Sequence, residues 1–344
     1  MKLRILVSSL LTLTLLPSSL LTAQQPATTL PRLAEAVLDV TAPSTRVSGI
    51  PGNMQIMERS CRNAPLGEDL RRRIVNTAVQ EWGFFGFQVE DQRNTAPVGN
   101  APNNNNARRR FGPLDPVEVS RVADSVGGSW SATPDSDWIL QRQNEAWNSS
   151  SGLTSRWRDP WSAAFISWVM CESGLGDEPR FKRAIAHHTY IDQAIMARDN
   201  KAPEAAYVAY DPGEQAIVPG DMLCSGLRPT YRTLAERRAQ LGVGARTHCD
   251  IVVQVNADAG QILTIGGNVR SSVRLKIFPA GDTGKSNLAL LPTARVIFAH
   301  LKLRTDSIEA DALRNSPTVQ NMACTMPTPA AFSIASIDLP AASC

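Results

Sequence analysis

The segment from Asp159 to Met170 constrains the fold more than any other part of the chain, because it predicts a buried helix. Asp159 is a favourable N-cap residue, and Pro160 suits the first helical position, whose N–H has no intrahelical partner. From Ser162 onward, residues recur at the i, i+4, i+7 and i+8 spacing of one helix face. Gly174 supplies a stop signal. We therefore expect a core helix that begins close to a serine hydroxyl.

Ser162 lies in the first turn of this predicted helix, where unpaired backbone N–H groups and the positive end of the helix dipole meet. A nucleophile at such a position becomes more acidic, and the neighbouring amides can hold an oxyanion. The alternative is a serine that helps to cap a core helix. Taken alone, the segment favours this structural alternative.

The N-terminal segment predicts the compartment. An uncharged apolar run from Ile5 to Leu21 follows two basic residues and is followed by small Ala23. We interpret residues 1–23 as a secretory signal peptide rather than a spanning helix, because Pro17 and several hydroxyl residues interrupt the run. No cysteine follows the run, and no later segment is long and apolar enough to cross a membrane. We expect a soluble periplasmic or secreted protein without a membrane anchor.

Charge and cysteine content narrow the choice of partners. Removing residues 1–23 takes away two positive charges and no negative ones, so the formal net charge of +3 falls to +1. This near-neutral total gives no reason to expect a nucleic-acid partner. The six cysteines predict up to three disulfides in an oxidising compartment, and Cys224 and Cys249 are candidates to bridge neighbouring strands. The absence of CxxC spacing argues against a zinc site, and no metal or cofactor is expected.

The chain divides by composition into three parts after the signal peptide is set aside. Residues 24–64 are rich in Pro, Thr, Ser and Ala and predict an extended leader. Residues 65–305 are expected to form one domain, with a flexible polar insertion near 91–112 whose arginines could touch an anionic surface. Residues 306–344 predict an irregular tail pinned by a disulfide.

The order of predicted elements gives the fold class. Apolar residues at helical spacing predict a helix from Asp69 to Phe85, with further helices over 115–126 and 179–198. Four tryptophans in 128–158 indicate irregular structure with aromatic anchors. A turn leads into a strand over 217–224, and further β-branched runs predict strands over 248–255, 261–269, 273–278 and 295–303. Helices followed by strands indicate an α+β domain, with helices packed on a mainly antiparallel sheet.

Three polar residues follow one another at the starts and ends of these elements. Ser162 opens the helix, His248 begins one predicted strand, and Asn268 ends the next after two glycines. A nucleophile, an imidazole base and an amide that orients the base are the minimum set for acyl transfer. The alternative for His248 is a buried histidine with a structural role.

Four short motifs resemble those of the bacterial domain DUF2272 over roughly residues 65–305. They are Pro160-Trp161-Ser162-Ala163-Ala164-Phe165, Pro219-Gly220-Asp221, His248-Cys249-Asp250-Ile251-Val252 and Gly266-Gly267-Asn268. That domain in turn resembles the NlpC/P60 and CHAP group of papain-like peptidoglycan amidases and endopeptidases. The resemblance implies a papain-like, NlpC/P60-type fold and an exported hydrolase that acts on an amide bond in peptidoglycan peptides.

The sequence departs from this superfamily at the nucleophile, because Ser162 stands where the superfamily has cysteine. A thiol can be held as a thiolate beside an imidazolium, whereas a serine hydroxyl must lose its proton during attack. The site is therefore a Ser-His-Asn hydrolase or a catalytically silent domain that binds cell-wall peptides or a protein partner through the same groove. An enzyme for another acyl substrate is a third possibility.

Several neighbouring residues are candidates for substrate binding. Trp161 can line the groove or pack in the core, and Asp250 shares the face of His248 and can join the site or pair with an arginine. His187 and His188 can line the cleft or lie at a surface or cap. Cys171 and Cys249 are expected to face away from Ser162 and His248 respectively. The oligomeric state, the bond that is cleaved and the role of the insertion stay open.

Overall fold

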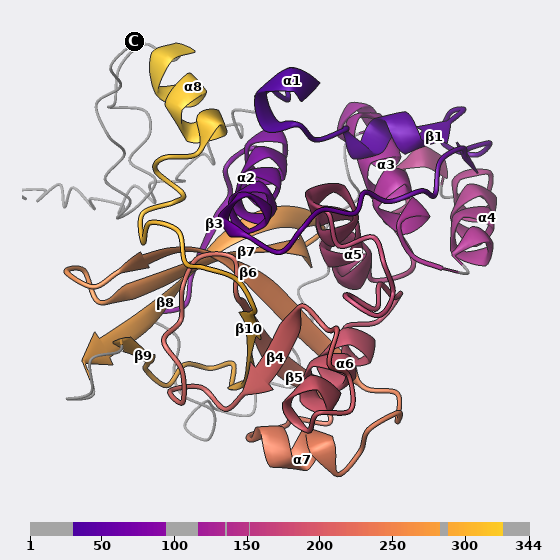
Figure 1. The fold of residues 1–344 in the computed structure, drawn as a ribbon. Helices are drawn as coiled ribbons and strands as arrows, with labels where there is room; N and C mark the ends of the chain where they lie inside the picture. Colours follow the sequence, from indigo (N-terminus) through magenta and orange to yellow (C-terminus); the bar gives the residue numbers. More distant parts are fainter. Residues whose placement is uncertain (1–29, 94–115, 135, 151, 283–287, 326–344) are drawn as a thin grey trace, which may run out of the picture.

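The computed structural model describes residues 30–93, 116–134, 136–150, 152–282 and 288–325. In these residues, eight α-helices accompany a mainly antiparallel sheet of eight strands (Figure 1). The predicted α+β class is confirmed at this level. The predicted signal peptide, positions 94–112 of the insertion and positions 326–344 of the tail lie outside the described residues. The expectation of an irregular tail is wrong for Pro317–Thr325, which form a helix because Val319 and Met322 pack in the hydrophobic core. No helix in the described ranges is long and apolar enough to cross a membrane.

The sheet has one parallel pair, between its first two strands, and is otherwise antiparallel. Among the described strands, β9 pairs with β8 alone and lies beside the main strand order. The predicted strands are present, several of them longer than expected, whereas β3, β4 and β9 are too short to show an alternating pattern in the sequence. In spatial order the strands are β3 (Val89–Asp91), β8 (Ser272–Asp282), β7 (Gln261–Val269), β6 (Arg246–Asn256), β5 (Met222–Arg228), β10 (Ile297–Leu303) and β4 (Tyr207–Tyr210), with β9 (Leu288–Leu290) beside β8.

Two helices pack on the central strands of the sheet, and a third packs on its edge (Figure 1). The two central helices are α2 (Glu68–Phe84) and α5 (Ser162–Ser173). Against α5 lies α3, while α6 covers the edge strand β4 and α8 contacts α2. The remaining bounds are α1 (Glu35–Leu38), α3 (Pro116–Ser131), α4 (Asp137–Trp147), α6 (His188–Arg198), α7 (Leu234–Arg238) and α8 (Pro317–Thr325).

The start of α5 differs from the prediction. The helix begins at Ser162 and its N-cap position belongs to Trp161, whose indole cannot accept hydrogen bonds from the helix amides. Asp159 does not cap the helix, because its carboxylate pairs with Arg142 at 2.8 Å. The predicted stop is confirmed, since Gly174 follows the last turn with a φ of 116°.

Two further expectations about helices are wrong. Residues 179–187 are not helical, because the side chain of Gln193 hydrogen-bonds the backbone of this segment and takes the place of helical partners. Its Nε2 donates to the carbonyls of Glu178 and Pro179, and its Oε1 accepts from the Lys182 amide at 2.7 Å. The stretch 128–158 is less irregular than expected, because α3 extends to Ser131 and α4 follows it.

Alternation along the strands divides the interior into two cores. Ile251 and Val253 of β6 face the helices and belong to the main core. Val252 points to the opposite face, where it packs with Leu223 and Ile262 in a smaller second core. From the start of β6 to Val253, odd-numbered side chains therefore face α5 and even-numbered ones face the second core. This parity decides which residues can meet Ser162.

The N-terminal part of the described chain packs on the body of the domain. Residues 30–64, which the sequence analysis expects to be extended, contain α1 and a small hairpin of two short strands, Val47–Ser48 and Gln55–Ile56. Arg46 is buried and pairs with Glu172 near the end of α5 at 2.6 Å. The segment is therefore held by a buried ion pair as well as by apolar contacts.

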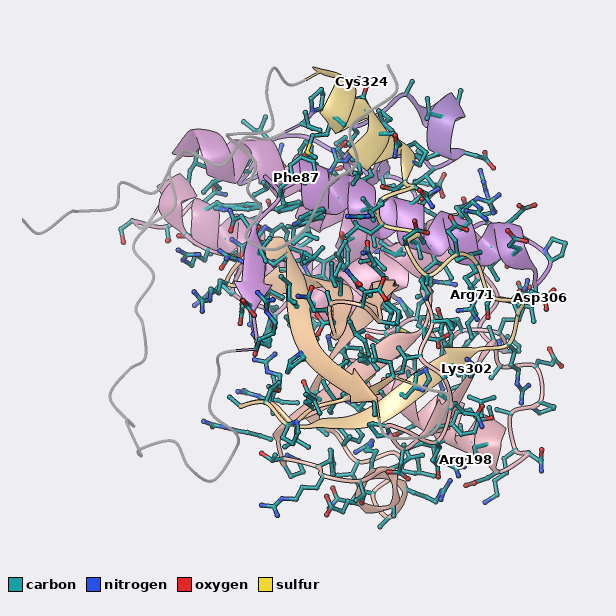
Figure 2. The ribbon with its side chains drawn as sticks, turned by 90° about the vertical axis from the view of Figure 1, so that its left-hand side faces the viewer. Arg71, Phe87, Arg198, Lys302, Asp306 and Cys324 are labelled. Carbon is teal, nitrogen blue, oxygen red and sulfur yellow. A yellow bond between two sulfur atoms is a disulfide. The ribbon has the colours of Figure 1, made fainter. Side chains whose placement is uncertain are left out.

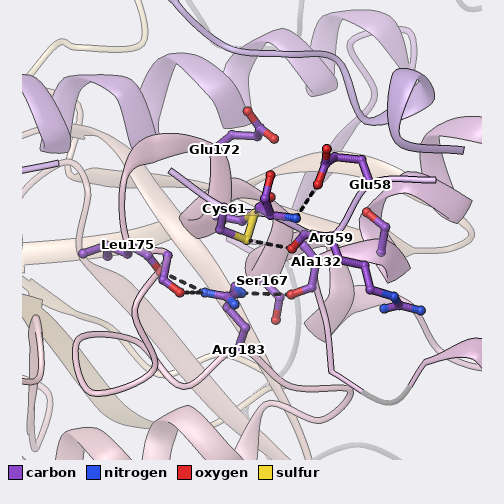
Figure 3. The surroundings of a disulfide bond; sticks show 12 residues. Glu58, Arg59, Cys61, Ala132, Ser167, Glu172, Leu175 and Arg183 are labelled. Atoms are coloured by element: carbon purple, nitrogen blue, oxygen red, sulfur yellow. Dashed lines mark hydrogen bonds between the residues drawn. A yellow bond between two sulfur atoms is a disulfide. The ribbon is translucent and has the colours of Figure 1, made fainter. Parts of the chain in front are cut away.

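Two disulfides join described residues. Cys61–Cys171 fastens the N-terminal segment to α5, close to Arg183, which donates to the carbonyls of Ala132 and Leu175 (Figure 3). Cys224–Cys249 links residues directly opposite each other on β5 and β6, which confirms the predicted bridge between neighbouring strands. Both bonds are compatible with an extracellular or periplasmic location.

The Pro219-Gly220-Asp221 motif has a structural explanation. The Arg71 guanidinium from α2 donates to the Asp221 carboxylate at 2.9 Å and to the Pro219 carbonyl at 2.7 Å. It also donates to the carbonyl of Asp306 beyond β10 (Figure 2). Gly220 has a φ of 91°, and a Cβ there would lie 2.5 Å from the Arg71 side chain. The motif thus anchors α2 to β5 through a fully buried ion pair.

We predict that Arg71→Met lowers the free energy of unfolding by about 3–5 kcal/mol, because it removes the fully buried guanidinium and leaves the Asp221 carboxylate to His300 and the more distant Lys302. The neighbouring Arg72 pairs at the surface with Glu68 and Glu309, so Arg72→Met should cost only about 0–1 kcal/mol. Urea unfolding of both variants measures the difference. Equal losses would show that the buried pair does not anchor the helix.

Candidate functional site

The hydroxyl that opens α5 has an imidazole partner. Ser162 Oγ lies 2.7 Å from His187 Nε2, the residue directly before α6. Ser162 is 8% exposed and His187 is 3% exposed, so the contact is nearly closed to solvent. The predicted partner of the serine was His248, and the structure instead gives this hydrogen bond to a histidine contributed by another element.

The second ring nitrogen of His187 is also occupied. Tyr190 Oη contacts His187 Nδ1 from one turn later in the chain, the i, i+3 spacing that places two side chains on one helix face. The backbone N–H of Cys249 donates to the same nitrogen at 3.3 Å. His187 is thus fixed between α5, α6 and β6.

These contacts assign the proton of the neutral His187 ring. A backbone N–H can only donate, so a ring nitrogen that accepts from Cys249 carries no proton. The neutral ring then carries its proton on Nε2 and donates it to Ser162 Oγ. In this tautomer the serine accepts a hydrogen bond from the imidazole, whereas a general base would have to accept one from the serine.

The Cys249 amide is available because β6 and β7 separate at this point. Their ladder begins at Ile251, which pairs with Ile265, and the same register would set Gly267 opposite Cys249. A Cβ on Gly267 would lie 2.5 Å from the Phe165 side chain of α5. The glycine lets the helix approach, and the His187 ring takes the hydrogen bond that a strand partner would otherwise supply.

His248 belongs to a buried charged cluster next to this position. Its Nε2 lies 2.9 Å from Asp250 Oδ1 and 3.0 Å from Lys276 Nζ. The Lys276 ammonium contacts both carboxylate oxygens of Asp250 at 2.8 Å. All three side chains are buried, and the ring centroids of His248 and His187 are 5.2 Å apart. The two histidines therefore connect the Ser162 hydroxyl with the charged cluster.

The cluster lies on the sheet face opposite α5. Strand alternation points His248 and Asp250 away from the face on which Cys249 and Ile251 contribute to the main core. Gly266 makes room for the cluster, because a Cβ there would lie 1.9 Å from the Asp250 carboxylate. The expectation that Asp250 shares the face of His248 is in line with this geometry, and its cationic partner is a lysine.

Burial and charge act on the pKa values of the whole set. Burial lowers the pKa of His187 well below its usual value, with further lowering from the charges of His248 and Lys276. Burial also lowers the pKa of His248, although Asp250 opposes it. For Asp250, burial would raise the pKa, but His248 and Lys276 outweigh it and keep the carboxyl ionised. Burial raises the pKa of Tyr190, which stays a phenol.

Asn268 has a backbone role that the structure makes clear. It has a φ of 54° and lies where the β7–β8 register gains an extra residue between Gly266 and Val269. Asparagine tolerates this left-handed conformation better than most residues. No hydrogen bond joins Asn268 to His248 among the described residues. Its predicted part in orienting the imidazole stays a prediction.

The other candidates have identifiable surroundings. Trp161 is 3% exposed and packs in the main core, with its ring 5.8 Å from that of Phe85. His188 is half-buried and its Nδ1 lies 3.1 Å from the Ala245 carbonyl, which ties α6 to the segment before β6. Their predicted contact with substrate stays a prediction.

The sequence indicates His187 only as a residue that can line the cleft, and neither Tyr190 nor Lys276 is predicted to belong to the site. His187 and Tyr190 carry a signal, because their i, i+3 spacing places an imidazole and a phenol on one helix face. Lys276 carries none: in a strand with one buried face, a lysine between Leu275 and Ile277 reads as solvent-exposed. Only the three-dimensional pairing with Asp250 explains its burial.

We predict that the domain loses stability as the pH falls from 6.5 to 5.5. The pKa values of His187 and His248 are lowered by folding, so the unfolded chain binds more protons in this window. Each such proton makes the free energy of unfolding fall by up to about 1.4 kcal/mol per pH unit. Urea unfolding at several pH values measures the slope.

The slope of unfolding free energy against pH reports how many more protons the unfolded chain binds. The variant His187→Gln should lower this number by about one, because it removes one buried imidazole. Ile195→Val, at a buried position on α6, serves as a control that lowers stability and leaves the slope unchanged. A His187→Gln slope equal to that of the wild type would contradict the assignment of a neutral, buried imidazole.

No group of three or more His, Cys, Asp or Glu side chains in the described ranges is arranged to hold a metal ion.

Comparisons with known proteins point to one family. No curated protein and no solved structure matches the chain. A family model described as an uncharacterized protein conserved in bacteria, DUF2272, matches residues 120–298. These residues include α5, His187 and the strands that carry His248, Asp250 and Lys276. Because the match spans just over half of the 344 residues, the chain belongs to the DUF2272 family.

Proposed function

We propose that the protein is a papain-like acyl hydrolase in which Ser162 is the nucleophile and His187 is its proton acceptor. The observation that carries the proposal is the 2.7 Å contact between Ser162 Oγ and His187 Nε2 at the first residue of a buried helix. A nucleophile and an imidazole within hydrogen-bond reach are the core of covalent acyl transfer. His187 thereby takes the place that the sequence analysis gave to His248.

The helix start adds a means of stabilising negative charge. The amides of Ser162, Ala163 and Ala164 precede the first residue that bonds within the helix, Phe165, whose N–H donates to Trp161 at 2.9 Å. These amides and the helix dipole favour an oxyanion next to the hydroxyl.

The proposed reaction begins with a change of tautomer. The proton of the His187 ring must move from Nε2 to Nδ1. The new Nδ1–H then makes a hydrogen bond to Tyr190 Oη, and the hydrogen bond from the Cys249 amide is lost. The Ser162 hydroxyl then loses its proton to Nε2 as its oxygen attacks the carbonyl carbon of the substrate. The imidazolium returns this proton to the leaving amine, and the acyl-serine ester forms. Water deprotonated by His187 hydrolyses that ester and frees the serine.

His187 is a weak base in this scheme. Its burial and the charge of Lys276 both oppose the imidazolium, and the charge of Asp250 supports it. Asp250 acts on His187 through space, with His248 in between. The carboxylate thus contributes part of what a directly bonded aspartate would provide in a serine hydrolase.

The hydrogen bond from Cys249 to His187 favours a second candidate function. In the tautomer that it enforces, His187 is a donor to Ser162, and the serine proton is free to bond a ligand. Such a site would bind without cutting, as a silent domain for cell-wall peptides or for a protein partner. The two functions use the same residues and differ in which nitrogen of His187 holds the proton.

The substrate class and compartment come from the resemblance to NlpC/P60 and CHAP enzymes, which act on amide bonds of peptidoglycan. We propose peptidoglycan peptides as the substrate and the periplasm or the exterior as the site of action. The N-terminal sequence pattern and the two disulfides support export.

Incubation of the purified protein with peptidoglycan tests the proposal. We expect wild type to release new amino groups, and Ser162→Ala and His187→Gln to lower the rate by about 10²-fold or more. Ile195→Val, at a buried position on α6 away from the site, is the control and should keep most of the activity. Ser162→Cys should retain or raise activity if the surroundings still suit a thiolate.

A sedimentation assay with intact sacculi separates the two functions. Release no greater than that of Ser162→Ala, together with sacculus binding, would refute the hydrolase and support the silent domain. Loss of both release and binding would refute both wall-directed functions. Activity that survives His187→Gln but not His248→Gln would return the base role to His248.

A further inference from the structure

A pocket on the sheet face opposite α5 has a composition that fits a specific type of ligand. Its volume is about 270 Å³, just below the usual range for ligand sites and suited to a small molecule. Hydrophobic side chains make most of its wall, and Arg295 is the one charged residue among its described lining residues. The lining residues are Pro212, Phe278, Leu290, Leu291, Pro292, Thr293, Arg295, Val296 and Ile297.

The pocket borders the second core and lies on the same face as the charged cluster. Phe278 pairs with Ile262, a member of that core, and Leu290 and Ile297 pack against it. Phe278 follows Lys276 by two residues on β8, so both side chains point to this face of the sheet. The pocket is therefore separated from the Ser162 hydroxyl by the sheet.

The backbone of Arg295 is fixed by hydrogen bonds to the Thr293 side chain. Thr293 Oγ1 donates to the Arg295 carbonyl at 2.9 Å and accepts from the Arg295 amide at 3.3 Å. The Arg295 side chain is half-buried, and no carboxylate of the described residues lies within ion-pair distance of it. A guanidinium that is partly removed from water in an apolar wall favours an anion as its neighbour.

The charges around the pocket point the same way. Asp250 is paired with Lys276, so its negative charge is already balanced. The charge of Arg295 reaches the cluster, where it helps to lower the pKa values of His248 and Lys276. Glu90, the other acid whose charge acts on Lys276, pairs with Arg270, so neither carboxylate is a partner of Arg295.

We propose that this pocket binds a small carboxylate that carries an apolar chain, with Arg295 pairing with the carboxylate and the proline, leucine and phenylalanine side chains covering the chain. The site is distinct from the Ser162–His187 contact, and the proposal stands whether or not the protein is a hydrolase. A fatty acid and a peptide that ends in an apolar residue share this chemistry.

Titration calorimetry with the full-length protein tests the proposal. Octanoate represents the fatty acid and N-acetyl-leucine the peptide terminus, whereas octan-1-ol lacks the charge and acetate lacks the chain. We expect one of the two apolar carboxylates to bind and both controls to bind at least about tenfold more weakly, because each lacks one of the two interactions. The tighter of the two carboxylates identifies the source.

The variant Arg295→Gln should weaken binding by about ten- to hundredfold, and Arg295→Lys by less, because lysine keeps the charge but not the forked geometry. Arg304→Gln is the control, since this exposed arginine bonds Pro203 at the far edge of the sheet. Amide shifts of Thr293 and Ile297 on addition of octanoate or N-acetyl-leucine locate the bound molecule. No binding of either carboxylate, or equal affinity for octan-1-ol, would overturn the proposal, as would an unchanged affinity in Arg295→Gln.

Discussion

The arrangement of the site depends on one hydrogen bond, from the Cys249 amide to His187 Nδ1. Where β6 and β7 separate, an imidazole takes the hydrogen bond of a missing strand partner. Buried backbone amides need an acceptor, so this bond fixes both the position and the tautomer of His187. Its other nitrogen then reaches Ser162. The serine, the two helices and the sheet are joined through a single ring.

The sheet divides the polar residues into two groups with different tasks. On the helix side, Ser162, His187 and Tyr190 form the candidate reaction site. On the opposite side, Lys276 and Asp250 form a buried ion pair with His248 between them and the site. Removing one partner of such a pair is costly, which makes the cluster a fixed source of charge for the nearby rings. Burial is the main cause that lowers the pKa of His187 and keeps it neutral; the charges of His248 and Lys276 act in the same direction, and the charge of Asp250 opposes them.

Much of the fold could be predicted from the sequence because its signals are local. The periodicity of α2, the β-branched residues of β6 and β7, and the turn residues between them gave elements close to those observed. The prediction of a helix over 179–187 is wrong because of a tertiary contact. The Gln193 side chain makes hydrogen bonds to this backbone that helical partners would otherwise supply. The prediction that Asp159 caps α5 is wrong for a similar reason, because the Asp159 carboxylate pairs with Arg142 instead.

The candidate site was predictable only in part. Ser162 is marked by its place at a helix start, which is local, and the Cys224–Cys249 bridge follows from strand order. His248 and His187 compete for the same role, and the choice depends on which strand face each ring can reach. The parity of β6 turns His248 toward Asp250, and neither parity nor the gap beside Gly267 is visible before the register is known.

Nitrogen NMR of the histidine rings tests the central claim most directly, because the ¹⁵N shifts of an imidazole report which nitrogen carries the proton. For wild type at pH 7, with His187→Gln used to assign the signals, we predict a neutral His187 ring protonated at Nε2 and not at Nδ1. This result would establish that the Cys249 amide sets the tautomer and that Ser162 accepts from the ring. A ring protonated at Nδ1, or at both nitrogens, would contradict the account.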